Sequence, residues 1–582
     1  MTSAVGADTE RKVTIMKKAS VSSRKLRYGG ITAVLTAFII ALVIILNVIV
    51  TMLSQRFLLY VDMTPELLYT VSDTCIDLIR NGDSEFDSVS PIEMVDSIRE
   101  ENRKYNEENG LSEGESGYAD ENAMINIIFC DEIDALQKNS SQRYVYNTAL
   151  ELQNEFPDHI KITNHNIFRN PSAVSKYLVT STSTISPSSV IVEFGTEFRV
   201  YTINSFFTFN ESDEPWAYNG EKKFTAGILA VTRAESPIAC ITGNHGEDLS
   251  GVEPLANAIL DAGYTLQILD LSTEEIPADC RLMVVFNPNS DFMVKDGISN
   301  IDEIEKLDAF LDGTNSMMVF MSPDSPELDN FESYLEEWGI KFDRYTDAQG
   351  LKYPYMIKDS SQALTTDGFT IVSEYADYGL GGTITEDMRK VSYPKKVIFS
   401  RAMSISYSDR YTPTHYKSED NEADQYDYAT YISNGISRSV FDLFLTSDKA
   451  VAHAAGAEVA RATESNPLKL MTISMEDRTT QESNYTTVNE ASYVVACGSV
   501  EFASEALLQS ASYGNTDLLL SVCRYIGREP VPVGLTFKPF ADYDIDNITT
   551  AESTQYTVVL TVIPAVAAII AGAIVLIRRK NR

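Results

Sequence analysis

The segment Thr242-Gly243-Asn244-His245-Gly246-Glu247 places an imidazole and a carboxylate two residues apart between glycines. It follows the apolar run 237–242, so we expect it at the carboxyl end of a strand, where parallel α/β sheets bind ligands. His245 and Glu247 suit a general base with its orienting group, or a grip on a ligand. The structural alternative is a tight glycine turn in which both side chains cap the next helix. Because the loop holds no serine or cysteine nucleophile, the sequence favours this alternative.

Other catalytic and metal-binding signatures are missing from the sequence. It contains no GxxxxGK[ST], GxSxG or HExxH motif. The five histidines lack metal-ligand spacing, and the calcium-loop-like start at Asp542 fails at Asn547 and Ser553. Cys130 follows a strand-like run, but Ile133 occupies the partner position of a CxxC redox motif. We therefore expect no metal, no cofactor and no catalytic residues.

The elements that must position the 243–247 loop form a regular alternation of strands and amphipathic helices. Apolar strand-like runs lie at 237–242, 265–271, 282–286 and 316–321. The segments between them carry apolar residues at helical spacing. This alternation predicts an α/β fold with a parallel, doubly wound sheet over residues 234–349. After an irregular insertion at 350–467, residues 468–535 are expected to return to the same sheet.

Two further regions precede this sheet. Residues 123–233 have the expected order β-α-β-α-β-β-α, which resembles the thioredoxin-like arrangement. Residues 54–122 are expected to form juxtamembrane helices followed by an acidic, mobile insertion, because 100–122 is nearly free of aliphatic side chains. Residues 536–555 are expected to form a linker.

Two uncharged runs flank the whole region. Ile31–Leu53 has no charge over 23 residues and follows a basic tail, and Tyr556–Ile577 precedes a second basic tail. The first run is longer than a signal-peptide core and lacks a cleavage site. We therefore predict membrane helices at 29–53 and 556–577 that anchor the chain in the lipid bilayer. The basic tails 1–28 and 578–582 are then cytoplasmic, and 54–555 is extracytoplasmic.

Charge and cysteine content restrict the possible partners. The chain has a formal net charge of −36, and its basic residues concentrate in the two tails, so the intervening region is more acidic still. A nucleic-acid surface needs clustered lysine and arginine, and none is present there. The six cysteines show no CxxC spacing, and several lie in apolar runs where buried free thiols are common. The spacing leaves disulfide bonding open.

Three short patterns carry a resemblance to a known family. They are the strand–TGNHGE–helix segment at 237–260, DMT…YTVS at 62–72, and GSVEF…GNTDL at 498–518. Their order between two membrane spans is similar to the auxiliary, substrate-binding-like extracytoplasmic component of gliding-motility-type ABC transport systems. The resemblance implies separate permease and ATPase chains as partners. It also implies a sheet similar to the glutamine-amidotransferase-like Rossmann unit.

The chain departs from the family pattern at three positions. Asn244 interrupts the compact GHGE form, and Ser499 and Val500 replace the expected acidic residue. No Gly-x-Cys-x-Gly elbow occurs, so amidase activity is not implied. We interpret the chain as a non-catalytic, membrane-anchored auxiliary component of an ABC transport system. Two alternatives stay open: an envelope hydrolase or transferase using His245 and Glu247, and a structural envelope scaffold.

Overall fold

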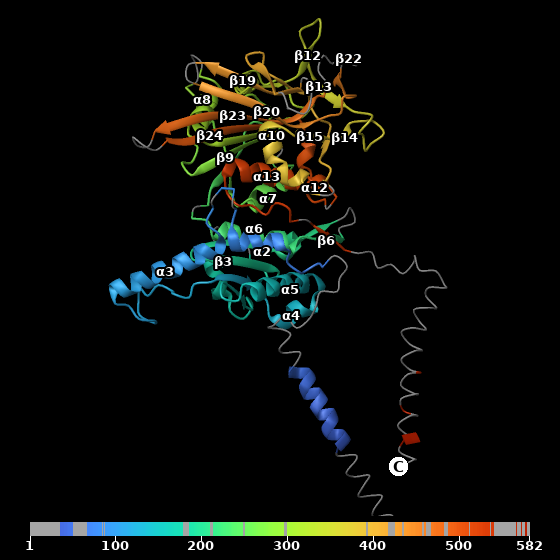
Figure 1. The fold of residues 1–582 in the computed structure, drawn as a ribbon. Coiled ribbons are helices and arrows are strands. Elements are labelled where there is room, and N and C mark those ends of the chain that lie inside the picture. The colour runs from blue at the N-terminus through green and yellow to red at the C-terminus, as the bar shows by residue number, and fades with distance from the viewer. Residues whose placement is uncertain are drawn as a thin grey trace, which may run out of the picture. The chain divides into compact units, whose positions relative to one another are not determined.

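The computed structural model describes most of the region between the two uncharged runs (Figure 1). The described residues are 35–49, 67–540 and the isolated positions 566, 572, 577 and 578. Within 67–540 the positions left out are 84, 87, 179–184, 210–213, 235, 248, 250, 296–299, 392–393, 417–424, 434–435, 457–458, 461–466, 482–486, 511 and 536. The chain separates into two compact units, Met1–Lys538 and Pro539–Arg582, and the site described below lies in the first.

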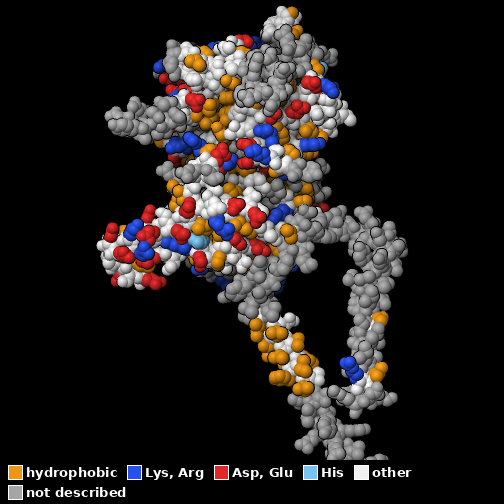
Figure 2. Space-filling model, in the orientation of Figure 1, with side chains coloured by type: hydrophobic (Ala, Val, Ile, Leu, Met, Phe, Trp, Pro, Cys, Tyr) orange, Lys and Arg blue, Asp and Glu red, His pale blue; other side chains and the backbone are white. Residues whose placement is uncertain are grey.

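The predicted membrane spans are only partly covered by the described residues. Of the first span, 29–53, residues 35–49 form a helix whose apolar side chains are exposed (Figure 2). Of the second, 556–577, three isolated positions are described. Among the described residues, no helix combines the length and apolar character needed to cross a bilayer. The tail 1–28 and most of the linker 536–555 lie outside the described residues, so the two-span topology stays a prediction.

A mixed four-stranded sheet forms the centre of residues 123–233. Its strands are β1 (Ile125–Phe129), β2 (Ile160–Asn164), β3 (Ser189–Phe194) and β4 (Glu197–Thr202), in the order β2-β1-β3-β4. β1 runs parallel to β2, whereas β3 is antiparallel to β1 and β4. Smaller elements are α4 (Ile133–Lys138), α5 (Ser140–Glu155), η1 (Pro171–Tyr177), η2 (Ile203–Phe206), β5 (Phe207–Phe209) and β6 (Pro215–Tyr218). α6 (Gly220–Val231) is buried along its whole length.

Two helices precede this sheet, α2 (Asp73–Asn81) and α3 (Pro91–Asn109). A capping box starts α3: Ser90 accepts a hydrogen bond from the Glu93 amide, and the Glu93 carboxylate accepts one from the Ser90 amide. Figure 2 shows charged side chains of both signs over this helix. Because α3 continues to Asn109, the first ten residues of the acidic segment 100–122 are helical, and its mobility stays a prediction.

The largest sheet contains five consecutive parallel strands. They are β7 (Ile238–Thr242), β8 (Thr265–Leu269), β9 (Cys280–Phe286), β10 (Ser316–Phe320) and β24 (Thr487–Cys497), in the order β24-β10-β9-β7-β8. The apolar runs of β7, β9 and β10 are nearly continuous, as expected for parallel strands buried on both faces. The strand order reverses at β7, because β8 and β9 lie on opposite sides of it.

Helices cover both faces of the parallel strands. α7 (Glu253–Asp261) and α13 (Asn515–Gly527) contribute to one apolar core with side chains such as Leu255 and Leu519. α8 (Glu303–Asp312) and α9 (Asp329–Glu337) contribute to the core on the other face with Leu307 and Phe331. All six cysteines are free and buried. The alternation predicted for residues 234–349 is therefore present as an α/β layer arrangement.

Part of residues 350–467, expected to be an irregular insertion, extends the same sheet, and other strands of this region form two smaller sheets. The long strands β19 (Gln425–Ser433) and β20 (Ile436–Leu445) pair antiparallel, and β20 pairs with β23 (Lys469–Gln481), which adjoins β24. The remaining strands are β11 (Ile340–Phe342), β12 (Arg344–Thr346), β13 (Lys352–Lys358), β14 (Thr370–Val372), β15 (Glu374–Tyr375), β16 (Ile398–Ser400), β17 (Ile405–Tyr407), β18 (Thr412–Tyr416), β21 (Val451–Ala454), β22 (Val459–Ala460) and β25 (Lys538–Pro539). The short helices are α10 (Gly379–Ile384), α11 (Glu386–Arg389), η3 (Glu501–Ala503) and α12 (Glu505–Leu508).

Candidate functional site

The 243–247 loop lies at the carboxyl end of β7, where the strand order reverses. In open α/β sheets this reversal leaves a crevice between neighbouring loops that commonly holds a ligand. Here the loop after β9 closes onto it, because the His245 carbonyl accepts hydrogen bonds from the amides of Asn289 at 2.7 Å and Ser290 at 2.8 Å. The chain's own backbone therefore joins the two loops across this crevice.

His245 is surrounded by side chains on every polar edge. It is 3% exposed, and its Nδ1 lies 3.2 Å from Glu247 Oε1 while its Nε2 lies 3.2 Å from Glu303 Oε2. The ring stacks on Phe292 with a centroid distance of 3.9 Å. The Glu303 carboxylate also accepts a hydrogen bond from the amide of Met293 at 2.7 Å. With both ring nitrogens occupied and one ring face covered, His245 has no lone pair directed at a substrate.

The charges of this cluster follow from competing effects. Burial lowers the pKa of His245, but the hydrogen bonds and charges of Glu247 and Glu303 outweigh it and raise that pKa to about 9. Burial raises the pKa of Glu247. The hydrogen bonds that its carboxylate accepts from His245 and other groups have the larger effect, so this pKa lies below its usual value. At neutral pH the group is a buried carboxylate–imidazolium–carboxylate cluster in which His245 donates from both nitrogens. This arrangement fixes the loop against α8.

We expect the stability of the fold to fall in alkaline solution because of His245. In the folded protein the pKa of His245 is about 9, above its ordinary value of 6.5. The contribution of His245 to the free energy of unfolding is therefore complete below pH 6.5 and is lost as the pH rises through 9. The full shift corresponds to about 3 kcal/mol. The measurement is the denaturant midpoint of the full-length chain across this pH range, compared with His245→Phe, which keeps the ring stack. A difference between the two proteins that is independent of pH would contradict the assignment.

The glycines of the loop are required, but the expected helix cap does not form. Gly246 has φ 76°, and a Cβ there would lie 3.1 Å from the Asn289 side chain. Asn244, also at φ 76°, is exposed. α7 begins after Val252 without any side-chain cap. The structural alternative is therefore correct in predicting a tight glycine turn. It is wrong in predicting that the side chains cap the next helix, because His245 bonds to α8 and not to α7.

The residues of the 498–518 pattern hold strand β16 in the core. The Asn515 side chain accepts from the Ile398 amide at 3.0 Å and donates to the Ile398 carbonyl at 2.8 Å. The Ser499 hydroxyl donates to the Ser400 carbonyl at 2.6 Å. Asp517 forms an ion pair with Lys395 at 2.9 Å. These residues have packing roles, and none of them presents an unpaired group to a ligand in the described structure.

The structure describes the 62–72 pattern only from residue 67. This segment contacts residues at the C-terminal end of the first unit. The carboxylate of Glu221, 5% exposed, accepts a hydrogen bond from the Ser72 amide at 2.6 Å and pairs with Lys538 at 2.8 Å. Lys538 Nζ also donates to the carbonyls of Thr70 at 2.6 Å and Leu67 at 3.1 Å. The segments that follow the first uncharged run and precede the second therefore converge on one buried carboxylate.

Sequence reasoning missed Glu303, Glu221 and Lys538. Glu303 and Lys538 carry no local signal, since their partners lie far away in the sequence. Glu221 had one: Glu221-Lys222-Lys223 begins a helix that is otherwise apolar. Three consecutive charges at the start of an all-round apolar helix indicate buried ion pairs, because such a helix is enclosed by protein.

Comparisons with known proteins do not place the chain in a family. No family model matches it, and no curated protein matches it. Among solved structures, a similar chain is the mmIFT52 N-terminal domain, with 12% sequence identity, a TM-score of 0.30, and coverage of 50% of this chain and 97% of that chain. A TM-score this low supports no argument about fold or function.

Proposed function

We propose that this chain is a non-catalytic, membrane-anchored auxiliary subunit of an ABC transport system of the gliding-motility type. In this proposal two membrane helices, 29–53 and 556–577, place both termini in the cytoplasm. The extracytoplasmic region 54–555 binds envelope or substrate partners and couples them to separate permease and ATPase chains. The observation that carries the proposal is the convergence of both membrane-proximal flanks on Glu221.

This convergence suits a coupling role. A displacement of either flank is transmitted to Glu221 through Ser72 or Lys538. The next two residues of α6 extend the connection to the large sheet, because Lys223 pairs with Asp261 of α7 at 2.7 Å, and Lys222 lies 3.9 Å from Asp517 of α13. One buried helical turn thus connects the flanks to two helices that cover the parallel strands. Buried ion pairs of this kind specify one geometry, as a coupling element requires.

Fold details support the resemblance without depending on a comparison. The order β2-β1-β3-β4, with β3 antiparallel to its neighbours, supports the proposed thioredoxin-like subdomain. The order β8-β7-β9-β10-β24 supports the proposed doubly wound, Rossmann-like sheet. The occupied ring nitrogens of His245 argue against the alternative of an envelope hydrolase or transferase.

The test is a pull-down on a tag at the C-terminus in mild detergent, with mass spectrometry of the captured proteins. We expect one ATPase and one multi-span permease in a fixed ratio. Lys538→Ala removes a charged contact between the flanks and should reduce the captured ATPase about tenfold, the equivalent of about 1.4 kcal/mol. Lys352→Ala, which removes an exposed ion pair with Glu327, is the matched control. Capture of neither subunit, or equal capture by Lys538→Ala and Lys352→Ala, would overturn the proposal.

A further inference from the structure

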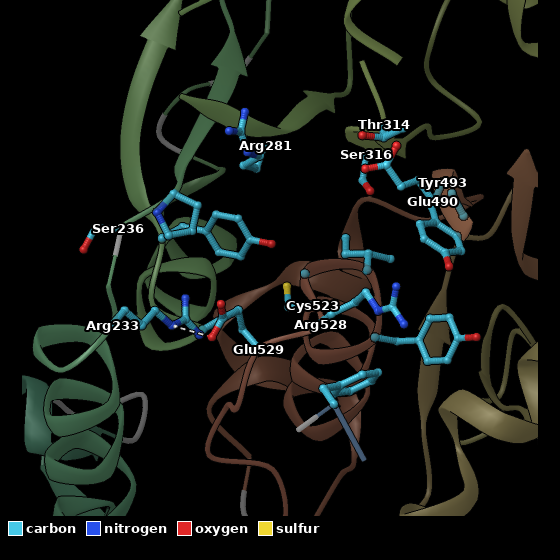
Figure 3. Close-up of a pocket in the computed structure, with 18 of the residues that line it drawn as sticks. Arg233, Ser236, Arg281, Thr314, Ser316, Glu490, Tyr493, Cys523, Arg528 and Glu529 are labelled. Atoms are coloured by element: carbon cyan, nitrogen blue, oxygen red, sulfur yellow. Dashed lines mark ion pairs between the residues drawn. The ribbon is translucent and has the colours of Figure 1, made fainter. Parts of the chain in front are cut away.

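A cavity of about 1110 Å³ lies at the amino ends of the parallel strands, at the opposite edge of the sheet from the His245 loop (Figure 3). The first residues of β9 and β10, the segment before β7, the end of α13 and the edge of β23 and β24 all contribute to its lining. Its volume is at or above the upper end of small-molecule sites, about 300–1,000 Å³. The cavity therefore suits a ligand larger than a single amino acid.

The charges in this cavity differ in sign and are largely unpaired. Three arginines and five carboxylates line it: Arg233, Arg281, Arg528, Glu197, Asp279, Asp477, Glu490 and Glu529. Among the described residues, the only ion pair between lining residues joins Arg233 and Glu529, at 3.7 Å. The excess of carboxylates disfavours polyanions such as nucleic acids, and the polar lining disfavours acyl chains. A ligand carrying both an ammonium and a carboxylate could pair with groups of both signs.

Arg233 is the buried cation of this cavity. Its side chain is 5% exposed, and its Nε lies 3.7 Å from Glu529 Oε2, which is beyond hydrogen-bond distance, so within the described part of the chain this Nε has no hydrogen-bond acceptor. Its Nη2 donates to the Pro530 carbonyl at 3.0 Å, so the guanidinium is held in place. A buried donor without an acceptor is destabilising, and native proteins seldom leave one unmatched. Figure 3 shows Arg233 beside Glu529, with the ion pair between them marked.

Carboxylates also occur beside the arginines, because Glu529 pairs with Arg233 and Asp279 precedes β9, and the strand order sets the distance from this side to Glu490. Arg281 stands at the start of β9 and Arg233 precedes β7, whereas Glu490 lies on β24, with β10 between β24 and β9. Strands about 4.8 Å apart place Arg281 about 10 Å and Arg233 about 14 Å from the β24 side. An extended peptide advances about 3.3 Å per residue, so three or four residues span this distance. Thr314 and Ser316 lie between the two groups and offer hydroxyls to a peptide backbone (Figure 3).

We propose that this cavity binds a short peptide with free termini, its carboxylate toward Arg233 and Arg281 and its ammonium toward Asp477 and Glu490. Tyr493, beside Glu490 in the lining, presents an aromatic ring to the ammonium end. This inference goes beyond the proposed transport role and does not rest on it, since it concerns a binding site on this chain alone.

The test is calorimetric titration of the purified full-length chain in detergent with four probes: tetra-alanine, N-acetyl-tetra-alanine, tetra-alanine amide and alanine. We expect tetra-alanine to bind most tightly, with each blocked form and free alanine weaker by about tenfold or more, because each loses a charge-assisted contact. Binding of alanine as tight as that of tetra-alanine would overturn the assignment of a peptide. Binding of both blocked forms as tight as that of tetra-alanine, or no binding of tetra-alanine at about 10 mM, would overturn the site altogether.

Two variants assign the ends of the ligand. Arg281→Gln, at an exposed side chain, should discriminate less between tetra-alanine and its amide than the wild type does, because one of the two partners of the carboxylate is lost. The double variant Asp477→Asn/Glu490→Gln should lose the discrimination between tetra-alanine and its N-acetyl form. Arg169→Gln, at a surface ion pair whose arginine is 79% exposed, is the matched control and should bind like the wild type. If both test variants still discriminate between tetra-alanine and its blocked forms as the wild type does, the assignment of the two ends of the ligand is wrong.

Discussion

Replacing Glu303 by alanine is expected to lower the free energy of unfolding by about 3–5 kcal/mol. The carboxylate is 1% exposed and accepts from His245 Nε2 and from the Met293 amide. Its removal leaves a buried imidazolium with one carboxylate and a buried amide without an acceptor. The measurement is the denaturant midpoint of the full-length chain at neutral pH, where His245 is charged. The midpoint of Glu303→Gln should lie between those of the wild type and Glu303→Ala, because glutamine keeps an acceptor oxygen but loses the charge.

Glu305→Ala is the matched control for this prediction. Glu305 lies in the same first turn of α8 but is exposed, so only the favourable interaction of an acidic residue with the helix dipole is lost. Its replacement should cost less than about 1 kcal/mol. Equal midpoints for Glu303→Ala and Glu305→Ala would show that the buried cluster does not stabilise the fold.

The two halves of this cluster differ in how far sequence reasoning could reach. His245 and Glu247 are two residues apart beside a strand, so their proximity was predictable. Glu303 lies 58 residues from His245, and only the position of α8 beside β9 brings them together. An acidic residue in the first turn of a helix normally indicates an exposed charge near the helix dipole, so nothing in the local pattern marked Glu303 as buried.

The parallel strands were predictable for a physical reason that does not extend to residues 350–467. Strands buried on both faces must be apolar along their length, and β7, β9 and β10 coincide closely with the predicted runs. β19 and β20 extend the sheet by antiparallel pairing, without helices between them. Their sequences mix tyrosine, serine and aspartate, because antiparallel strands can leave one face in water. The apolar-run signal is therefore absent in that region.

The two edges of the parallel strands have opposite characters. At the carboxyl edge, which the motif and the general rule both indicated, hydrogen bonds and a ring stack close the crevice. At the amino edge, which no motif marked, a large cavity holds unpaired charges. The cavity residues come from nine separate segments between residues 86 and 529, so no contiguous pattern could reveal it. The fold, and not the motif, determines where this chain has room for a ligand.

The second large effect is expected at Gly498. Its amide donates to the Leu470 carbonyl at 3.0 Å, and its carbonyl accepts from the Met403 amide at 2.5 Å, so neighbouring segments hold the backbone. A Cβ at this position would lie 2.1 Å from the Met403 carbonyl oxygen. Gly498→Ala must therefore displace backbone and break these hydrogen bonds. We expect it to lower the free energy of unfolding by at least about 3 kcal/mol.

Gly514, the other glycine of the same pattern, separates steric contact from a general intolerance of alanine. It is also buried, but a Cβ there would meet only side-chain atoms of Met388, Lys395 and Val397 at 3.1–3.3 Å. These side chains can shift, so Gly514→Ala should cost about 1 kcal/mol or less. Both variants are measured by denaturant unfolding of the full-length chain. If Gly498→Ala unfolds at the same midpoint as Gly514→Ala, the backbone approach between Gly498 and Met403 does not constrain the fold, and the spacing of glycines in this pattern has another cause.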